Sequence, residues 1–127
     1  MKDFTNWHKR KSKIDQIENR PYFHEGEVWY THLGLNIGYE QDGKGDDYLR
    51  PVLIIRKFNQ DICWVLPLTH TKKNNIFYAQ ITVLNKPSAV ILSQIRLMDA
   101  KRFSHIIAKI PSKDFKLVKE KLKALIP

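Results

Sequence analysis

Residues 50–69, RPVLIIRKFNQDICWVLPLT, contain two apolar runs separated by a short polar link. The runs are residues 52–55 and 62–66, and the link is residues 57–61. Apolar runs of about four or five residues bounded by turn residues are typical of strands that are buried on both faces. The sequence therefore predicts two buried strands joined by a turn.

Four further segments have strand patterns. Residues 89–92 form a third continuous apolar run, and residues 77–83 alternate more openly between apolar and polar side chains. Residues 26–35 are rich in β-branched and aromatic side chains, and residues 105–110 end the series. Five or six short strands around one small core predict a mainly β protein with the architecture of a small barrel.

A long loop follows the first predicted strand. Residues 36–49 carry glycines and acidic residues that are typical of turns, and a connection of this length is often functional. Residues 38–44 match the phosphate-binding pattern G-x-x-x-x-G-K, but Gly45 stands where that pattern needs Ser or Thr, and a strand rather than a helix follows. We therefore predict a flexible acidic loop and no nucleotide site.

Both ends of the chain have helical patterns. In residues 1–20, four apolar side chains fall on one side of a helix: Phe4, Trp7, Ile14 and Ile17. This helical extension is expected to end before Arg20 and Pro21, so that residues 21–127 form the barrel domain. A C-terminal α-helix with Ser112 as its N-cap is predicted from a second stripe: Phe115, Val118, Leu122 and Leu125.

The positive charge is concentrated at the two ends. The 127-residue chain carries a formal net charge of +9, of which +3 lies in residues 1–20 and +6 in residues 101–127. A polyanion such as RNA is a natural partner for such a chain, because binding to phosphates releases counterions. A lysine-rich helix face that is merely solvated also explains the C-terminal charge.

Several classes of protein and site are not indicated. No apolar run approaches the roughly 20 residues of a membrane-spanning helix, and the charged N-terminus lacks the apolar region of a secretory signal. We therefore expect a cytoplasmic protein. The five histidines form no close pair, the single Cys63 excludes a Cys₄ zinc site, and residues 42–47 lack the spacing of a calcium loop. No metal or cofactor is predicted, and Cys63 is expected to be a small buried side chain.

Four short motifs occur in a fixed order along the chain. They are GEVW at residues 26–29, GYEQ at 38–41, RP at 50–51 and QIRLMD at 94–99. Together, over residues 25–126, they resemble the PemK/MazF family of toxins from type II toxin-antitoxin pairs. The resemblance implies an SH3-like barrel, usually a homodimer, that cleaves single-stranded RNA without a metal or cofactor and is silenced by a cognate antitoxin.

The chain departs from the family pattern in three ways. The loop between Gln41 and Arg50 is longer than in compact members, and residues 1–20 have no counterpart in them. Ser93 stands where many members carry Asp or Glu, a carboxylate that is assigned as the general base in some of them. With Ser93 there, either another group is the base or the activity is weak or lost.

Metal-free RNA cleavage needs a base for the 2′-hydroxyl proton, a donor to the leaving 5′-oxygen and positive charge at the phosphate. Arg50 suits the last role because its planar fork binds two phosphate oxygens. Thr69 resembles the family's hydroxyl donor to the same phosphate. The alternatives are that Arg50 forms a local ion pair with Asp46 or Asp47 and that Thr69 only caps a turn.

Two residues are candidates for the remaining catalytic work. Glu40 is the carboxylate of a matching motif, and it would act as the base or orient Arg50. His70 directly follows Thr69, and histidine side chains titrate at about pH 6.5, which suits proton transfer at neutral pH.

The other predicted site residues would bind RNA: Tyr39, Gln41, Ser93, Gln94 and Arg96. Tyr39 is an aromatic side chain that could stack on an unpaired base, as are Phe77 and Tyr78, although aromatic side chains beside apolar strands are more often part of the core. Gln41 and Gln94 would position the loop and a strand. Arg96 could instead pair with Asp99, three residues further along.

Two interpretations compete with the endoribonuclease. Gyrase-poisoning toxins resemble the same barrel but grip a protein partner and do not cleave RNA. A catalytically inactive family member would only bind RNA or an antitoxin. Arg50, Thr69 and the motif at residues 94–99 favour the endoribonuclease, whereas Ser93 favours the alternatives.

Overall fold

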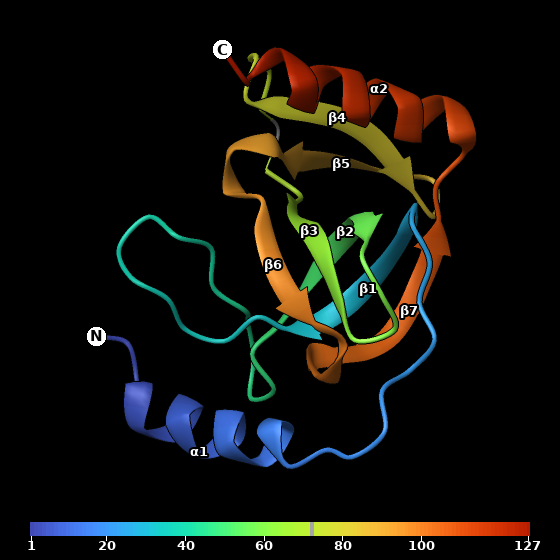
Figure 1. The fold of residues 1–127 in the computed structure, drawn as a ribbon. Coiled ribbons are helices and arrows are strands. Elements are labelled where there is room, and N and C mark those ends of the chain that lie inside the picture. Colours follow the sequence, from blue (N-terminus) through green and yellow to red (C-terminus); the bar gives the residue numbers. More distant parts are fainter. Residues whose placement is uncertain (72) are drawn as a thin grey trace.

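A computed structural model describes residues 1–71 and 73–127 of the chain. The seven strands found in these residues form one curled antiparallel sheet in the order β4-β5-β3-β2-β1-β7, with β6 paired to β3 (Figure 1). The strand bounds are β1 Glu27–His32, β2 Leu49–Lys57, β3 Ile62–Thr69, β4 Tyr78–Val83, β5 Lys86–Ile91, β6 Arg96–Asp99 and β7 Phe103–Lys109. The prediction of a mainly β, barrel-like fold is confirmed.

Strand β2 lies at the centre of the sheet and is buried on both faces. Its alternate residues Leu53 and Ile55 belong to one hydrophobic cluster, and Val52 and Ile54 belong to a second cluster on the other side. This two-sided burial explains why the strand is a continuous apolar run rather than an alternating one. In the neighbouring run on β3, Cys63, Val65 and Leu66 are buried. Ile62 is half-buried and Trp64 is 44% exposed, although we predicted both faces to be covered.

One strand more than the predicted five or six is present. The segment after the 3₁₀-helix η1 (Leu92–Gln94) returns along β3 as β6 and pairs residues 62–65 with residues 96–99. Its sequence, Arg-Leu-Met-Asp, is too short and too polar at its ends to produce a strand pattern by itself. Another 3₁₀-helix, η2 (Ala100–Arg102), then leads directly into β7.

The C-terminal helix α2 (Ser112–Ala124) lies across β4 at one end of the sheet (Figure 1). Val118 is fully buried there, and the side chains Phe115, Leu122 and Leu125 pack against the same cluster, as the apolar stripe predicted. The predicted cap is displaced by one position: Pro111 is the N-cap and makes no side-chain hydrogen bond, and Ser112 is the first helical residue. Proline has no side-chain hydroxyl with which to cap, and its carbonyl accepts a hydrogen bond of 3.0 Å from the amide of Phe115.

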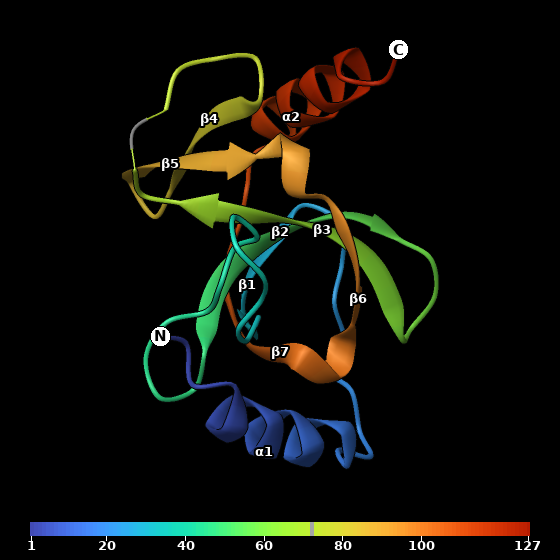
Figure 2. The ribbon, with the colours of Figure 1, turned by 90° about the vertical axis from the view of Figure 1, so that its left-hand side faces the viewer.

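The N-terminal helix α1 (Phe4–Asp15) lies at the opposite end of the sheet from α2 (Figures 1 and 2). Asp3 caps it by accepting a hydrogen bond from the Asn6 amide at 3.1 Å. Trp7 and Ile14 are buried as predicted, but Phe4 and Ile17 are 49% and 40% exposed. Phe4 is the first residue of the helix, and Ile17 lies beyond its end. Among the described residues no helix combines the length and the apolar character needed to span a membrane.

Candidate active site

The ends of β2 and β3 bring Arg50 and Thr69 together. The two strands pair with Val52 opposite Pro67, and beyond that point Thr69 is paired with Ala89 of β5. The Nη1 atom of Arg50 donates a hydrogen bond of 3.1 Å to the carbonyl of Leu68. The backbone of Arg50 is also paired with Thr31 of β1, so the guanidinium starts from a rigid support.

Arg50 donates a second hydrogen bond, from Nε to the carbonyl of Asp42 at 2.6 Å. A guanidinium has five N–H groups. Two of those of Arg50 are bonded to residues that the structure describes, which leaves three for an anionic ligand. Burial lowers the pKa of Arg50, and the nearby Asp42 carboxylate opposes that shift. The alternative of an ion pair with Asp46 or Asp47 is wrong: Arg50 contacts backbone carbonyls, and the Asp47 carboxylate lies 3.5 Å from Nη2 of Arg10.

The hydroxyl of Thr69 accepts a hydrogen bond of 3.2 Å from the amide of Thr71. This contact is the turn cap that the sequence analysis gave as the alternative role of Thr69. It uses only an acceptor lone pair of the hydroxyl, so the hydroxyl proton is left to donate elsewhere. His70 is exposed between these two residues. The turn therefore holds the Thr69 hydroxyl at the end of β3, one residue after the Leu68 carbonyl that Arg50 contacts.

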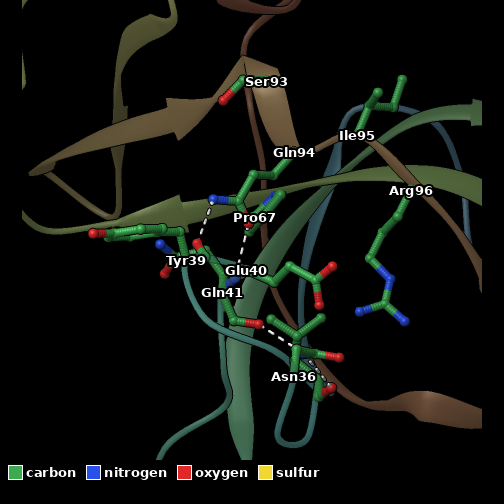
Figure 3. Close-up of a pocket in the computed structure, with 10 residues that line it drawn as sticks. Asn36, Tyr39, Glu40, Gln41, Pro67, Ser93, Gln94, Ile95 and Arg96 are labelled. Carbon is green, nitrogen blue, oxygen red and sulfur yellow. Dashed lines mark hydrogen bonds between the residues drawn. The ribbon is translucent and has the colours of Figure 1, made fainter.

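Beside this pair lies an open cleft of about 510 Å³. One wall is the β1–β2 loop, and the other is η1 with the start of β6; Figure 3 shows the side chains that point into the space. The lining residues include Asn36, Tyr39, Glu40, Gln41, Pro67, Ser93, Gln94 and Arg96. All five predicted RNA-binding residues and Glu40 are in this set, whereas Arg50, Thr69 and His70 are not.

Gln94 fastens the two walls of the cleft to each other. Its Oε1 accepts a hydrogen bond of 2.8 Å from the amide of Gln41, and its Nε2 donates one of 3.3 Å to the carbonyl of Tyr39 (Figure 3). Both contacts reach the backbone of the loop and leave the Gln41 side chain unused. Gln94 thus positions the loop, in the way that the sequence analysis expected for Gln41 and Gln94 as a pair.

Arg96 and Glu40 supply the charges of the cleft. Their side chains point toward the same space from opposite walls (Figure 3). Burial lowers the pKa of Arg96, and the Glu40 carboxylate opposes that shift. Glu40 also accepts a hydrogen bond of 3.0 Å from the Ile37 amide, so one of its oxygens is held within its own loop. A partly buried guanidinium facing an open cleft is a suitable contact for a phosphate.

The expected pairing of Arg96 with Asp99 is wrong. Asp99 accepts two hydrogen bonds from Arg20, at 2.8 Å from Nε and 2.9 Å from Nη2, which also hold its pKa below the ordinary value. Consecutive strand residues alternate between faces, so Arg96 and Asp99 lie on opposite faces of β6. Arg96 is therefore available to the cleft, and Arg20 takes the carboxylate.

Tyr39 and Ser93 lie on the open rim of the cleft. Tyr39 is fully exposed, and no core packing accounts for it; Phe77 is 47% exposed. Aromatic side chains beside apolar strands are more often part of the core, but Tyr39 is not. Ser93 is exposed in η1, beside Gln94.

The sequence analysis missed Asn36 and Asp42, which shape the loop. Asn36 donates a side-chain hydrogen bond of 2.7 Å to the Gln41 carbonyl, and its amide donates one of 2.6 Å to Oδ1 of Asp42. The sequence could have indicated these roles, because Asn and Asp side chains in a glycine-containing loop commonly form hydrogen bonds to nearby backbone groups. Residues 41 and 42 also join the two halves of the site, since Gln41 is held by Gln94 and Asp42 contacts Arg50.

A metal centre is not formed by the residues that the structure describes. In residues 1–71 and 73–127, no three His, Cys, Asp or Glu side chains come close enough together to ligate an ion. Cys63 is fully buried, as predicted, and burial raises the pKa of its thiol to about 12.

The sequence model of the PemK-like and MazF-like toxins of type II toxin-antitoxin systems matches residues 24–126. The chain belongs to the PemK/MazF family. The family predicted from the four motifs is therefore confirmed. The match begins after α1, so the N-terminal helix lies outside it. Among curated protein sequences, none is significantly similar to the chain.

Several solved structures share the fold of this chain. MazF from Deinococcus radiodurans is 20% identical, with a TM-score of 0.66 over 86% of this chain and 98% of that one. An endoribonuclease from a mycobacterial species is 14% identical, with a TM-score of 0.59 over 86% and 93% of the two chains. A mycobacterial endoribonuclease in complex with its cognate antitoxin is 16% identical, with a TM-score of 0.59 over 84% and 97%.

Proposed function

We propose that this PemK/MazF protein is the toxin of a toxin-antitoxin pair and a metal-independent, sequence-specific endoribonuclease that cleaves single-stranded RNA. The observation that carries the proposal is the hydrogen bond from Arg50 to the carbonyl of Leu68, the residue before Thr69, beside a cleft that presents Arg96 and an exposed Tyr39. The names of the structural neighbours include endoribonucleases, which supports the same activity.

The chemistry assigned to the strand ends is an in-line transesterification. The RNA 2′-oxygen forms a bond to phosphorus, the bond from phosphorus to the 5′-oxygen breaks, and the 2′-hydroxyl proton is balanced by one delivered to the leaving oxygen. Arg50 would face the phosphorane through its three remaining N–H groups, and the Thr69 hydroxyl would donate to a phosphate oxygen. The products are a 2′,3′-cyclic phosphate and a 5′-hydroxyl.

The cleft is assigned to binding. Arg96 would contact a neighbouring phosphate, and Tyr39 would stack on an unpaired base. Gln94 and Gln41 keep the two walls at the right separation, and Ser93 offers a hydroxyl on the rim. Stacking and phosphate contacts of this kind favour single strands, because their bases are not already paired.

The general base is Glu40 or His70, since Ser93 cannot serve as one. Glu40 lies in the cleft, and His70 adjoins Thr69 at the strand ends. Glu40→Gln and His70→Gln separate the two assignments by their pH–rate profiles: the variant that lacks the base loses the rate rise with pH, and the other keeps it.

The experiment that tests the proposal is cleavage of a long single-stranded RNA by the purified protein in EDTA, with the termini of the products identified. We expect fragments ending in 2′,3′-cyclic phosphate. Arg50→Ala, purified in parallel, controls for contaminating nucleases. Intact RNA after incubation with the folded wild-type protein would favour the non-catalytic or gyrase-poison-like alternatives that Ser93 supports.

The partners and location follow from the same proposal. A cognate antitoxin would silence the toxin, as the neighbour solved with its antitoxin suggests. A homodimer is proposed because Trp64, Phe58 and Leu97 leave an apolar patch on β3, its flanking turn and β6; a monomeric mass by light scattering at micromolar concentration would contradict it. The cytoplasm is the compartment in which RNA would be met.

A further inference from the structure

The N-terminal segment, residues 1–15, reaches the cleft loop although it lies outside the stretch matched by the family, residues 24–126. In both ribbon views the N-terminus lies beside the β1–β2 loop (Figures 1 and 2). The loop is the wall of the cleft that carries Tyr39, Glu40 and Gln41. A segment that contacts this wall from outside is placed to control its order.

Lys2 makes the contact nearest to the site. Its Nζ lies 2.9 Å from Oδ2 of Asp42 and donates a hydrogen bond of 2.6 Å to the carbonyl of Asn36. The two side chains of this ion pair are 31% and 26% exposed, so solvent screens the pair only in part. Lys2 thereby bridges two loop positions that are six residues apart.

Asp42 connects Lys2 to both halves of the site. Its Oδ1 accepts the Asn36 amide at 2.6 Å, and its carbonyl accepts Nε of Arg50 at 2.6 Å. Asp42 also adjoins Gln41, whose amide is fixed by Gln94. A change at Lys2 therefore reaches the wall of the cleft through one intermediate residue, whereas Arg50 keeps its separate hydrogen bond to the Leu68 carbonyl.

The helix holds the stem of the same loop. Trp7 is 6% exposed and packs where a Cβ atom at Gly34 would overlap its ring, and Gly34 has a φ of +81°. The ring centroids of Trp7 and Tyr48 are 5.1 Å apart. Since Gly34 and Tyr48 are hydrogen-bonded to each other at 3.2 Å, α1 covers both sides of the stem.

The helix is also anchored on the barrel, at its C-terminal end and at Trp7. Nζ of Lys101 donates a hydrogen bond of 2.9 Å to the carbonyl of Asp15, and the guanidinium of Arg102 lies 5.8 Å from the Trp7 ring. Both residues belong to η2, which leads into β7. The helix thus connects η2, at the start of β7, to the long β1–β2 loop.

We propose that residues 1–15 are an intramolecular brace for the β1–β2 loop, and that Lys2 is a positioning residue that acts on the cleft through Asp42. The proposal rests on the proposed function for its effect on RNA. An unbraced loop would sample more conformations, and RNA binding would have to restrict them. The brace therefore raises the affinity of the cleft for RNA and leaves the rate of the bound complex nearly unchanged.

The test compares Lys2→Met, which removes the charge, with Lys2→Arg, which keeps it. Lys9→Met, on the exposed face of α1, is the matched control. Amide hydrogen exchange of the peptides covering residues 34–48 is measured without RNA. We expect exchange to be roughly tenfold faster in Lys2→Met, close to wild type in Lys2→Arg, and unchanged in Lys9→Met. In RNA cleavage, KM should rise roughly fivefold for Lys2→Met alone, with kcat within about twofold of wild type.

The outcomes separate this proposal from the function on which it rests. Equal loop exchange in Lys2→Met and Lys9→Met overturns the brace whether or not the protein cleaves RNA. Faster exchange with an unchanged KM overturns the positioning role of Lys2. A wild-type protein that leaves RNA intact overturns the proposed function, and the exchange measurement then decides the brace without reference to cleavage.

Discussion

The strand-end pair and the cleft loop differ in what holds them in place. Arg50 is paired with Thr31 of β1 and Thr69 with Ala89 of β5, so strand pairing fixes the positions of both residues. The loop that carries Tyr39 and Glu40 is held chiefly by side chains, among them Gln94. Groups that stabilise a transition state need a rigid support, whereas groups that accommodate a ligand tolerate a movable one. We therefore expect substitutions at the strand ends to change the rate of the bound complex, and substitutions at the loop contacts to change binding.

The largest effect is expected at Arg50. Arg50→Ala should slow cleavage of a fluorogenic RNA in EDTA by on the order of 10²–10³, the effect of losing one preorganised donor at a developing negative charge. Arg50→Lys should recover little, because an ammonium cannot span two phosphate oxygens.

Arg56→Ala is the matched control for this substitution, since Arg56 is exposed on the same strand. It should cleave RNA like the wild type. Thermal melts should show a folded Arg50→Ala protein that is less stable by about 1–2 kcal/mol, because two backbone carbonyls lose their donor. Unreduced cleavage by Arg50→Ala would remove Arg50 from the chemistry.

A smaller effect is expected at Thr69. Thr69→Val keeps the shape but removes the hydroxyl, and the cleavage rate should fall roughly tenfold, in keeping with a neutral hydrogen bond worth about 1–1.5 kcal/mol. Thr69→Ser should stay near wild type because it keeps the donor. Equal rates for the valine and serine variants would show that the hydroxyl only caps the turn to Thr71.

Gln94 tests the other side of the comparison. Gln94→Ala removes both contacts to the loop backbone and should weaken RNA binding roughly fivefold. Gln94→Glu keeps the acceptor for the Gln41 amide but loses the donor to the Tyr39 carbonyl, so it should lie between wild type and Gln94→Ala. Fluorescence anisotropy with a 2′-O-methyl RNA, which cannot be cleaved, measures the affinity. An alanine variant that binds like the wild type would mean that the loop is ordered without this clamp.

The smallest effect on the site is expected at Asp99, which lies outside both regions. Its folded-state pKa is depressed, chiefly by the hydrogen bonds from Arg20, so its contribution to stability is present above the unfolded value and is lost as the pH falls through the lowered folded value. Asp99→Asn should melt below wild type at pH 6 and converge with it in acid, while cleaving RNA normally at pH 7. Parallel melting curves across the whole range would contradict this linkage.

The sheet could be predicted from the sequence further than the site could. A strand that is buried on both faces, such as β2, appears in the sequence as a continuous apolar run, so it can be predicted from local pattern. The four motifs were sufficient to predict the family. The division into an extension at residues 1–20 and a barrel at 21–127 stays a prediction, for which cooperative melting after deletion of residues 1–20 is the test.

The contacts of the site are less accessible to sequence reasoning because they join distant residues. Lys2 lies 40 positions before Asp42, and Gln94 lies 53 positions after Gln41. The pairing of Arg96 with Asp99 was inferred from their local spacing and is wrong for the same reason. The partner of Asp99 is Arg20, which is distant in the sequence and is brought next to it by folding. The residue types were predictable, but their pairing depended on the tertiary structure.

Single-turnover cleavage of RNA in EDTA, measured over a range of enzyme concentrations, tests the division of labour most directly. It yields the plateau rate of the bound complex and the enzyme concentration at half-saturation. We predict that Arg50→Ala lowers the plateau rate by on the order of 10²–10³ and leaves half-saturation within about threefold, and that Gln94→Ala does the reverse, raising half-saturation roughly fivefold with a plateau near that of the wild type. If both variants change the same parameter, the strand ends and the loop do not divide chemistry from binding.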